Sequence, residues 1–280
     1  MDRFEKICKD IKSVKIQSAE SIARAALKAL LLKHDKKAVK KLISLRPTEP
    51  CLRNAIKFAL SFSDIKEGVK LALKHFDEAK RKIAEYGSKL IENNMIVFTH
   101  CHSTNVVEVL LEAKKQKKRF EVYCTETRPL FQGRITAREL AKAKIPVTLV
   151  VDSAARIALK RADIAFIGAD AITAEGKVIN KIGSEMFAEI ASRYDVPFYS
   201  CTDSWKFDAI TAFGYKEKIE KRPSKEVWKK APKGVKILNL AFERVKPELV
   251  TAIVSELGIL KPETFLLEVK KAYPFLFGLT

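Results

Sequence analysis

The chain has 280 residues, with 53 Lys and Arg against 34 Asp and Glu, which gives a formal net charge of +19 at pH 7. Hydrophobic residues make up 47% of the chain, which is enough for a buried core and excludes wholesale disorder. No run of about 18 uncharged apolar residues occurs and the first residues carry no long apolar stretch, so neither a membrane span nor a secretory signal is expected.

Helical periodicity dominates the chain before residue 95. Apolar residues recur at helical spacing, and Ser18 and Asp64 stand where side chains that cap helix N-termini are preferred. The predicted helices are 18–32, 51–62 and 65–86. We therefore expect a helical domain over residues 1–94.

From residue 95 the pattern changes to short β-rich runs separated by amphipathic segments. Apolar strands that alternate with helices are typical of a parallel sheet covered on both faces. The predicted strands are 95–99, 120–124, 146–151, 164–168 and 197–201, with helices over 105–115 and 136–144, and with edge strands over 235–245 and 248–256. The sequence thus predicts an α/β fold in which a Rossmann-like, mainly parallel doubly wound sheet domain, 95–280, follows the helical domain.

Polar or reactive side chains follow all five of the main predicted strands. They are His100-Cys101-His102-Ser103, Thr125-Glu126-Thr127-Arg128, Asp152-Ser153, Asp170 and Thr202-Asp203. Ligands of such sheets bind beyond the carboxyl ends of the strands. The functional site is therefore expected at this edge of the sheet.

Several common sites are not indicated by the sequence. No G-x-G-x-x-G follows the first strand and no G-x-x-x-x-G-K-[ST] occurs, so neither a dinucleotide nor a P-loop site is expected. No C-x-x-C pair occurs, and the adjacent His100, Cys101 and His102 are poorly spaced to bind one metal, so we expect no metal and no cofactor. The five widely spaced cysteines indicate reduced thiols in the cytoplasm.

Cys101 and Asp170 are the candidates for proton transfer. A helix N-terminus stabilises a thiolate, and a protonated His100 or His102 would lower the pKa of Cys101 further. A small buried core cysteine is the alternative. A carboxyl group beside an apolar pocket can have a raised pKa and act as an acid, whereas an Asp that caps the next turn is the alternative for Asp170.

Four basic side chains are candidate anion binders. Lys181 follows Asn180 and precedes a Gly-Ser pair that is suited to open a helix, and Lys206 follows the last main strand. Arg46 and Arg128 each precede a proline, and such a fixed turn can aim an arginine at a ligand. A solvated surface position is the alternative for each of the two lysines. Aromatic residues are too sparse in the basic stretches for a stacking platform, so direct nucleic-acid binding is not expected.

Five motifs carry a resemblance to a known family. They are THCHS (99–103), TETRPLFQGRITAREL (125–140), VDSAA (151–155), GADAI (168–172) and INKIGS (179–184). In this order they resemble the translation initiation factor 2B alpha, beta and delta subunit family, which also contains isomerases of ribose 1,5-bisphosphate and methylthioribose 1-phosphate. The resemblance is strong over 95–210 and weak in the helical region. It implies a helical domain followed by a Rossmann-like domain, and a homodimer or higher homo-oligomer.

In the isomerase branch the resemblance implies that Cys101 and Asp170 are catalytic and that Asn180, Lys181 and Lys206 bind substrate. Two features depart from that branch. The branch carries an Arg-Gly-Ala phosphate loop where this chain has 16–19, which includes the altered pair Gln17-Ser18, and His102 stands in place of an Asn. The stretch KKRFEVYCTE (117–126) looks like the alpha subunit instead.

The sequence therefore supports two functions. The first is a regulatory subunit associated with guanine-nucleotide exchange that binds initiation factor 2, through its alpha subunit; a combined form of both functions is a subunit that senses a sugar phosphate or nucleotide in an inherited pocket. The alternative is a ribose 1,5-bisphosphate isomerase-like enzyme with Cys101 as base, Asp170 as acid, and Lys181, Lys206 and Arg46 at the phosphate. Whether the chain is an enzyme at all stays open at this point. Few glutamines among many Lys and Glu indicate a thermophile, and the family resemblance indicates an archaeal one.

Overall fold

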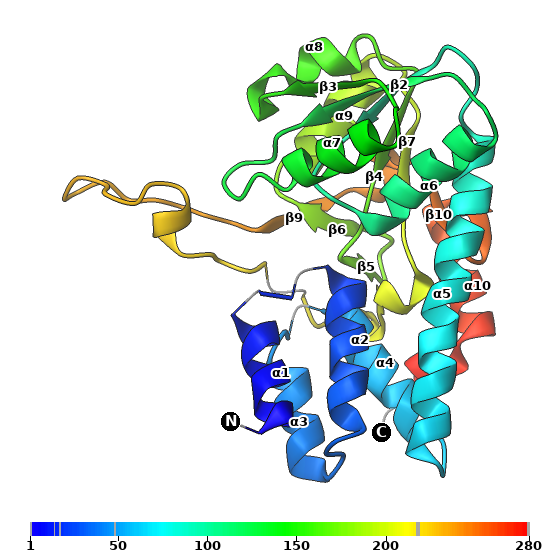
Figure 1. Ribbon diagram of the computed structural model, residues 1–280, viewed down its shortest axis with the longest axis vertical. Coiled ribbons are helices and arrows are strands. Elements are labelled where there is room, and N and C mark those ends of the chain that lie inside the picture. Colours follow the sequence, from blue (N-terminus) through cyan, green and yellow to red (C-terminus); the bar gives the residue numbers. More distant parts are fainter. Residues whose placement is uncertain (1, 14, 17, 48, 217–218, 279–280) are drawn as a thin grey trace.

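The computed structural model describes residues 2–13, 15–16, 18–47, 49–216 and 219–278 (Figure 1). The helices of the first part are α1 (Arg3–Lys12), α2 (Ala19–Leu30), α3 (Lys36–Ser44), α4 (Pro50–Leu60) and α5 (Ile65–Lys89). Ser18 and Asp64 cap α2 and α5 by accepting hydrogen bonds from backbone N–H groups, as predicted. The short α1 and α3 were not predicted. No helix that the structure describes is long and apolar enough to cross a membrane.

The main sheet has the Rossmann strand order in the described part of the chain. Its strands are β1 (Ile96–Thr99), β2 (Glu121–Thr125), β3 (Val147–Val150), β4 (Ile164–Ile167), β7 (Phe198–Cys201), β10 (Ala252–Ser255) and β11 (Gly258–Leu260). They lie in the order β11-β10-β7-β4-β1-β2-β3, and only β11 is antiparallel to its neighbour. The predicted Rossmann-like α/β class is therefore confirmed, since chain order reverses at β1.

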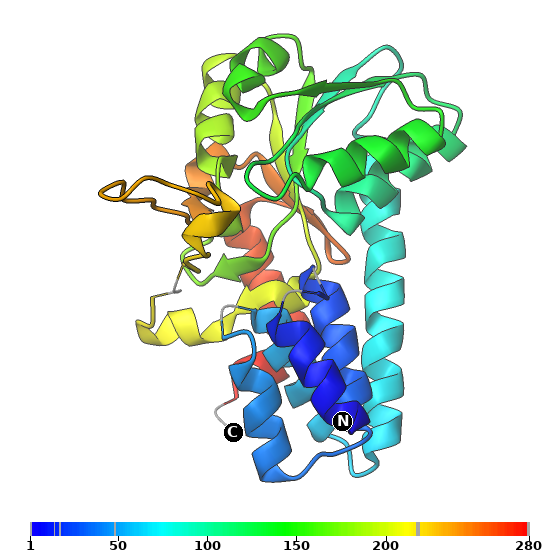
Figure 2. The same ribbon diagram turned by 60° about the vertical axis from the view of Figure 1, so that its left-hand side comes forward.

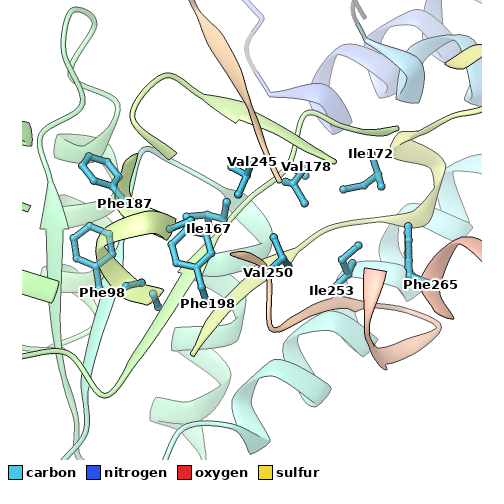
Figure 3. Packing of buried hydrophobic residues seen from close by; sticks show 14 of the residues in the cluster. Phe98, Ile167, Ile172, Val178, Phe187, Phe198, Val245, Val250, Ile253 and Phe265 are labelled. Carbon is cyan, nitrogen blue, oxygen red and sulfur yellow. The ribbon is translucent and has the colours of Figure 1, made fainter. Parts of the chain in front are cut away.

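Helices cover both faces of this sheet. They are α6 (Thr104–Lys115), α7 (Gly133–Lys142), α8 (Ala155–Leu159), α9 (Ser184–Arg193) and α10 (Pro262–Ala272). Successive strand residues point to opposite faces, so Val97 packs in one cluster with residues of α5, α6 and α7. Its neighbour Phe98 packs in the other, with Phe187 of α9 and Phe265 of α10 (Figure 3). This two-sided burial explains why the strands read as continuous apolar runs.

A second, four-stranded sheet was not predicted. It contains β5 (Ala171–Thr173), β6 (Val178–Lys181), β8 (Phe207–Asp208) and β9 (Phe242–Val245), in the order β8-β5-β6-β9. The expected edge strand 235–245 is therefore confined to β9, and in this sheet rather than in the main one. The expected edge strand 248–256 contains β10, which lies inside the main sheet because β11 pairs along its outer side. Before β9, the segment 222–239 forms an arm that extends from the body (Figures 1 and 2). Its Val235 and Leu238 side chains are 50% and 73% exposed.

The helical part and the main sheet are joined through Trp205. This residue follows β7, yet its side chain is buried in the same apolar cluster as residues of α1 to α5. The ring of His75, from α5, stacks on it with a centroid separation of 3.9 Å. Asn54 Nδ2, from α4, donates to the carbonyl oxygens of Trp205 and Phe207 at 2.8 and 2.9 Å. The orientation of the helices relative to the sheet is thus fixed by buried contacts.

His75 also forms an ion pair across this junction, and its strength is expected to depend on pH. Burial opposes the charge, but Asp203, whose Oδ2 lies 3.2 Å from His75 Nε2, raises the pKa of His75 above its usual 6.5. A raised folded-state pKa contributes stability that is complete below 6.5 and is lost as the pH rises through the folded value.

We therefore expect His75→Gln to lower the free energy of unfolding by about 1.5–3 kcal/mol at pH 6 and by less at pH 9. Urea unfolding at the two pH values measures this difference. The exposed His34 provides the control, because His34→Gln should leave the free energy unchanged at both. An equal loss for His75→Gln at pH 6 and pH 9 would contradict a charged pair.

Candidate functional site

A cavity of about 390 Å³ opens at the carboxyl ends of β1 and β4. These neighbouring strands continue in different directions, β1 into α6 and β4 into the second sheet, and such a switch point leaves a crevice. Six of the seven candidate site residues line the cavity. They are Arg46, Cys101, Asp170, Asn180, Lys181 and Lys206. Cys101, Asp170 and Lys206 follow main strands as expected, whereas Arg46 lies between α3 and α4, and Asn180 and Lys181 lie in β6.

Cys101 lies two residues after β1, with a φ of 67°. This left-handed conformation is uncommon outside glycine and costs on the order of 1–3 kcal/mol, so the surroundings must hold it. Its N–H donates to Thr127 Oγ1 at 3.0 Å, and its carbonyl accepts from Thr136 Oγ1 at 2.9 Å. Two threonines that follow β2 in the chain thus hold the backbone that aims the thiol into the cavity.

The thiol of Cys101 is protonated at neutral pH in this cavity. Burial raises its pKa to about 11, and the opposing effect of the Lys181 charge is smaller. The helix dipole was expected to stabilise the Cys101 thiolate, but this effect is weak because α6 begins only at Thr104, with Ser103 as its N-cap. The sequence prediction of a lowered pKa is therefore wrong.

The neighbouring histidines do not supply the expected positive charge. Burial lowers the pKa of His100 to about 4, and it also lowers the pKa of His102. The neutral His100 ring lies between Thr125 Oγ1, 2.5 Å from its Nδ1, and the Ile182 carbonyl, 3.0 Å from its Nε2. His100 is thus a structural support beneath the cavity, whereas His102 lines it.

Asp170 is a half-buried carboxyl group three residues after the end of β4. Its backbone N–H donates to the Ile179 carbonyl at 2.8 Å, and the chain continues directly into β5. The alternative role of Asp170 as a turn cap is thus not favoured, because a strand follows. Burial raises the pKa of its carboxyl group, and the charges of Lys206, Lys181 and Arg46 act against that rise. A carboxyl group with a raised pKa is suited to act as an acid.

Asn180 and Lys181 enter the cavity from β6, the unpredicted strand. The buried Asn180 side chain donates to Ser184 Oγ at 2.9 Å. Lys181 Nζ lies 4.7 Å from the centre of the Phe242 ring. Lys206, on the turn after β7, is 7% exposed and donates to the Ala169 carbonyl at 2.7 Å. Lys181 and Lys206 therefore place two ammonium groups on the cavity wall near Asp170.

Arg46 lines the cavity but is already paired with two carboxylates. Its guanidinium lies 2.9 Å from Glu49 Oε1 and 3.2 Å from Glu220 Oε2. Arg46 and Glu49 are 8% and 2% exposed. Burial raises the pKa of Glu49 to about 8, and the Asp170 charge contributes in the same direction. The expected phosphate-binding arginine is thus held by Glu49 and Glu220 instead of being free.

Arg128 is not placed at the cavity. Its guanidinium donates to the Val227 carbonyl at 3.1 Å and lies 5.2 Å from the centre of the Phe131 ring. The side chain therefore contacts Val227 of the arm instead of lining the cavity, and its predicted role in ligand binding has no support from the cavity. Gln17 of the altered phosphate loop lies outside the described residues, whereas Ser18 lines the cavity.

Two cavity residues were missed in the sequence. Glu49 Oε2 and Gln132 Oε1 are buried with no hydrogen-bond partner in the described protein, and both side chains line the cavity. Buried polar atoms are nearly always satisfied, so an unsatisfied pair at a cavity indicates contacts that a ligand completes. The available signal was the position of Glu49, three residues beyond Arg46 in the segment between two predicted helices. Within the described ranges, no group of three His, Cys, Asp or Glu side chains converges as a metal site requires.

Comparison with known proteins locates the chain among relatives of two kinds. The family model described as "Initiation factor 2 subunit family" matches residues 12–262. The ribose 1,5-bisphosphate isomerase of Thermococcus kodakarensis is 37% identical, over 91% of this chain and 90% of its own. An eIF-2B subunit 2-like protein of Pyrococcus furiosus is 28% identical, over 93% and 97%. The solved structure of the translation initiation factor eIF-2B of Pyrococcus horikoshii OT3 is 26% identical, with a TM-score of 0.84 over 95% and 99%.

Proposed function

The chain belongs to the initiation factor 2 subunit family, and we propose that it acts within that family as an aldose–ketose isomerase of a phosphorylated pentose. The observation that carries this proposal is the meeting of Cys101 and Asp170 in one cavity with Lys181 and Lys206. Similarity supports it too, because the isomerase relative is 37% identical and the eIF-2B-like relative 28%. Of the two functions considered from the sequence, the enzyme is thus better supported.

The proposed reaction needs one acid and one base at different atoms of the sugar. Asp170 gives a proton to the ring oxygen, and the bond between that oxygen and C1 breaks. Cys101 removes the hydrogen from C2, whose electron pair forms a double bond to C1. Cys101 then returns its proton to C1 and Asp170 takes the proton of the C2 hydroxyl group, which leaves a ketone at C2 and both side chains as they began. The hydrogens lost from C2 and its hydroxyl equal those gained by C1 and the ring oxygen, so no co-reactant is needed.

The two lysines are assigned to the phosphate on C1. Ammonium groups bind phosphate by charge-assisted hydrogen bonds, which are about twice as strong as neutral ones. The burial of Lys206, which is 7% exposed, strengthens its contact further. Fixing the phosphate in this way holds C1 and C2 in place between Cys101 and Asp170.

The test is turnover of ribose 1,5-bisphosphate, ribose 1-phosphate and methylthioribose 1-phosphate by the purified protein in D₂O. Phosphorus NMR and mass spectrometry should identify a ketose 1-phosphate, with deuterium at C1 where the transferred proton exchanges with solvent. Turnover of none of the three sugars would contradict the proposal.

The other function, a subunit that binds initiation factor 2, remains a prediction. It is tested by a pull-down with purified initiation factor 2 at moderate salt. The arm that carries the exposed Val235 and Leu238 is the first segment to delete in such an experiment, because it lies away from the cavity. Binding that survives deletion of the arm would place the partner elsewhere on the surface.

A further inference from the structure

Lys206 is carried by a turn that is too short to fix its own orientation. The turn is the 3-10 helix η2 (Ser204–Lys206), which begins three residues after the end of β7. Its backbone hydrogen bonds run from the Lys206 N–H to the Asp203 carbonyl, at 3.1 Å, and from the Phe207 N–H to the Ser204 carbonyl. Hydrogen bonds of a 3-10 turn have poorer geometry than those of an α-helix, so contacts from other elements must set the direction of η2.

Glu256 supplies such contacts from the neighbouring strand. It directly follows β10, which is parallel to β7, so its side chain starts at the same edge of the sheet as η2. The Ser204 N–H donates to Glu256 Oε2 at 3.2 Å, and the Ser204 hydroxyl group donates to Oε1. The Tyr273 hydroxyl group also donates to Oε1, at 3.0 Å. Three donors thus converge on a carboxyl group that is only 6% exposed.

Glu256 holds the first residue of the turn, and Lys206 is the last. Lys206 Nζ donates to the Ala169 carbonyl at 2.7 Å, directly before Asp170 in the chain. The surroundings of a buried side chain are close-packed, so Lys206 has little freedom to compensate for a displaced backbone. Glu256 does not line the cavity, and it can therefore affect a ligand there only through the turn.

Asp203 holds the middle of the same turn, but it has a second role. Its Oδ1 accepts from the Trp205 N–H at 2.7 Å, and its Oδ2 pairs with His75 at the junction with the helical part. A substitution of Asp203 would change both contacts at once. The two Ser204 contacts make Glu256 the better residue on which to test the turn.

We propose that Glu256 is a positioning residue for phosphate binding, because its carboxyl group fixes η2 and thereby holds the Lys206 ammonium group at the cavity wall. The inference rests on the proposed function, in which Lys206 binds the phosphate on C1. The Ser204 N–H can only donate, so Oε2 accepts whether or not the other oxygen carries a proton. The position of Lys206 thus depends on an accepting oxygen at residue 256 and not on the charge of Glu256.

A double-mutant cycle on Glu256 and Lys206 tests the proposal. Glu256→Ala should lower kcat/KM for the sugar with the highest turnover by about tenfold or more, the usual effect of losing one hydrogen bond to a charged group, and Lys206→Met should lower it further. In a Lys206→Met protein, Glu256→Ala should lower kcat/KM by less than about twofold, because the ammonium group that it positions is gone. Glu256→Gln keeps an accepting oxygen for the Ser204 N–H, so its kcat/KM should stay within about threefold of wild type.

Ser255→Ala is the matched control. Ser255 precedes Glu256 in the chain and is also buried, but its Oγ accepts from the Leu257 N–H at 3.1 Å, within the connection between β10 and β11. Its kcat/KM should stay within about twofold of wild type. The thermal midpoints of all variants show whether they fold, and Ser204→Ala, which removes one of the same contacts, takes the place of Glu256→Ala in the cycle if that variant does not fold.

Three results would overturn the inference and leave the isomerase proposal standing. They are an unchanged kcat/KM in Glu256→Ala, an equal loss with and without Lys206, and a Glu256→Gln protein as impaired as Glu256→Ala. If no sugar is turned over, the isomerase proposal fails, and the same cycle on the Kd for ribose 1-phosphate, measured by isothermal titration calorimetry, decides the inference. A loss of affinity that disappears in Lys206→Met supports it, whereas an additive loss, or no binding by the wild-type protein, overturns it.

Discussion

Replacing Cys101 with serine is expected to lower kcat/KM for the phosphorylated pentose by about 10²–10⁴-fold, the usual contribution of one general acid or base. The hydroxyl group of serine occupies the same place beside Lys181 but gives up its proton far less readily than a thiol. Steady-state kinetics on the sugar with the highest turnover measure the loss. The thermal midpoint should change little, because the side chain is small and borders an open cavity.

Cys8→Ser is the control for the effect of removing a thiol. Cys8 is buried in α1, away from the cavity, and its replacement should leave kcat/KM within twofold of the wild-type value. Activity of Cys101→Ser at the wild-type level would mean that the thiol takes no part in the reaction, whatever its position.

The pH dependence follows from how Cys101 and Asp170 share protons. The form of the pair that can react has a protonated Asp170 and a Cys101 thiolate, and we call it the working form. The raised pKa of Cys101, about 11, favours instead the form in which the single proton is on the sulfur. Both forms hold one proton, so the population of the working form follows the singly protonated pair. We therefore expect kcat/KM to rise through the lower pKa of the pair, to stay level, and to fall only as the pH approaches 11.

A pH–rate profile between pH 5 and pH 10.5 measures these limbs. A continued tenfold rise per pH unit above pH 8 would contradict the shared proton, because it would mean that only the thiolate form of Cys101 matters. Asp170→Asn should abolish the dependence on the lower pKa along with most of the activity.

Much of this site could be predicted because parallel strands bring their carboxyl ends to one edge. The apolar runs fixed the positions of β1 and β4, and from these the meeting of Cys101 and Asp170 follows. Lys181 was predicted from its place in a family motif and Lys206 from its place after a strand, and both side chains line the cavity. Arg128 also follows a predicted strand, yet its side chain contacts the arm. A turn determines the direction of the backbone, but it does not determine which group the end of a long side chain contacts.

The charge states could not be predicted, because they depend on burial that no local pattern reveals. His100 is 2% exposed and stays neutral, and Cys101 loses the solvent that would stabilise a thiolate. Glu49 was missed for a related reason. In the sequence it is one of many charged residues of the kind found on surfaces. Its carboxyl group is buried at the cavity only because the start of α4 packs close to β8 of the second sheet. The second sheet escaped prediction since strands of two to four residues carry too little alternation to recognise.

Gly133→Ala is expected to have the largest effect on stability. A Cβ atom at Gly133, the first residue of α7, would lie 1.8 Å from the Thr125 carbonyl oxygen and 3.1 Å from the Glu126 carbonyl carbon. Both are backbone atoms, so no rotation of a side chain relieves the clash. We expect the free energy of unfolding to fall by about 3 kcal/mol or more, as for the more severe overpacking changes. Urea unfolding measures it, and Gly278→Ala, with its nearest atom at 3.9 Å, should change it by less than about 0.5 kcal/mol.

The same substitution should also lower activity, for a reason that connects the fold to the chemistry. The loop between β2 and α7 that would have to move carries Thr127, whose Oγ1 accepts the hydrogen bond from the strained Cys101 backbone. A shift of this loop releases Cys101 from its left-handed conformation and turns the thiol away from the cavity. Stability and kcat/KM should therefore fall together in Gly133→Ala, whereas Cys101→Ser lowers kcat/KM alone. A Gly133→Ala protein that is destabilised yet keeps wild-type kcat/KM in its folded fraction would show that the loop does not position the thiol.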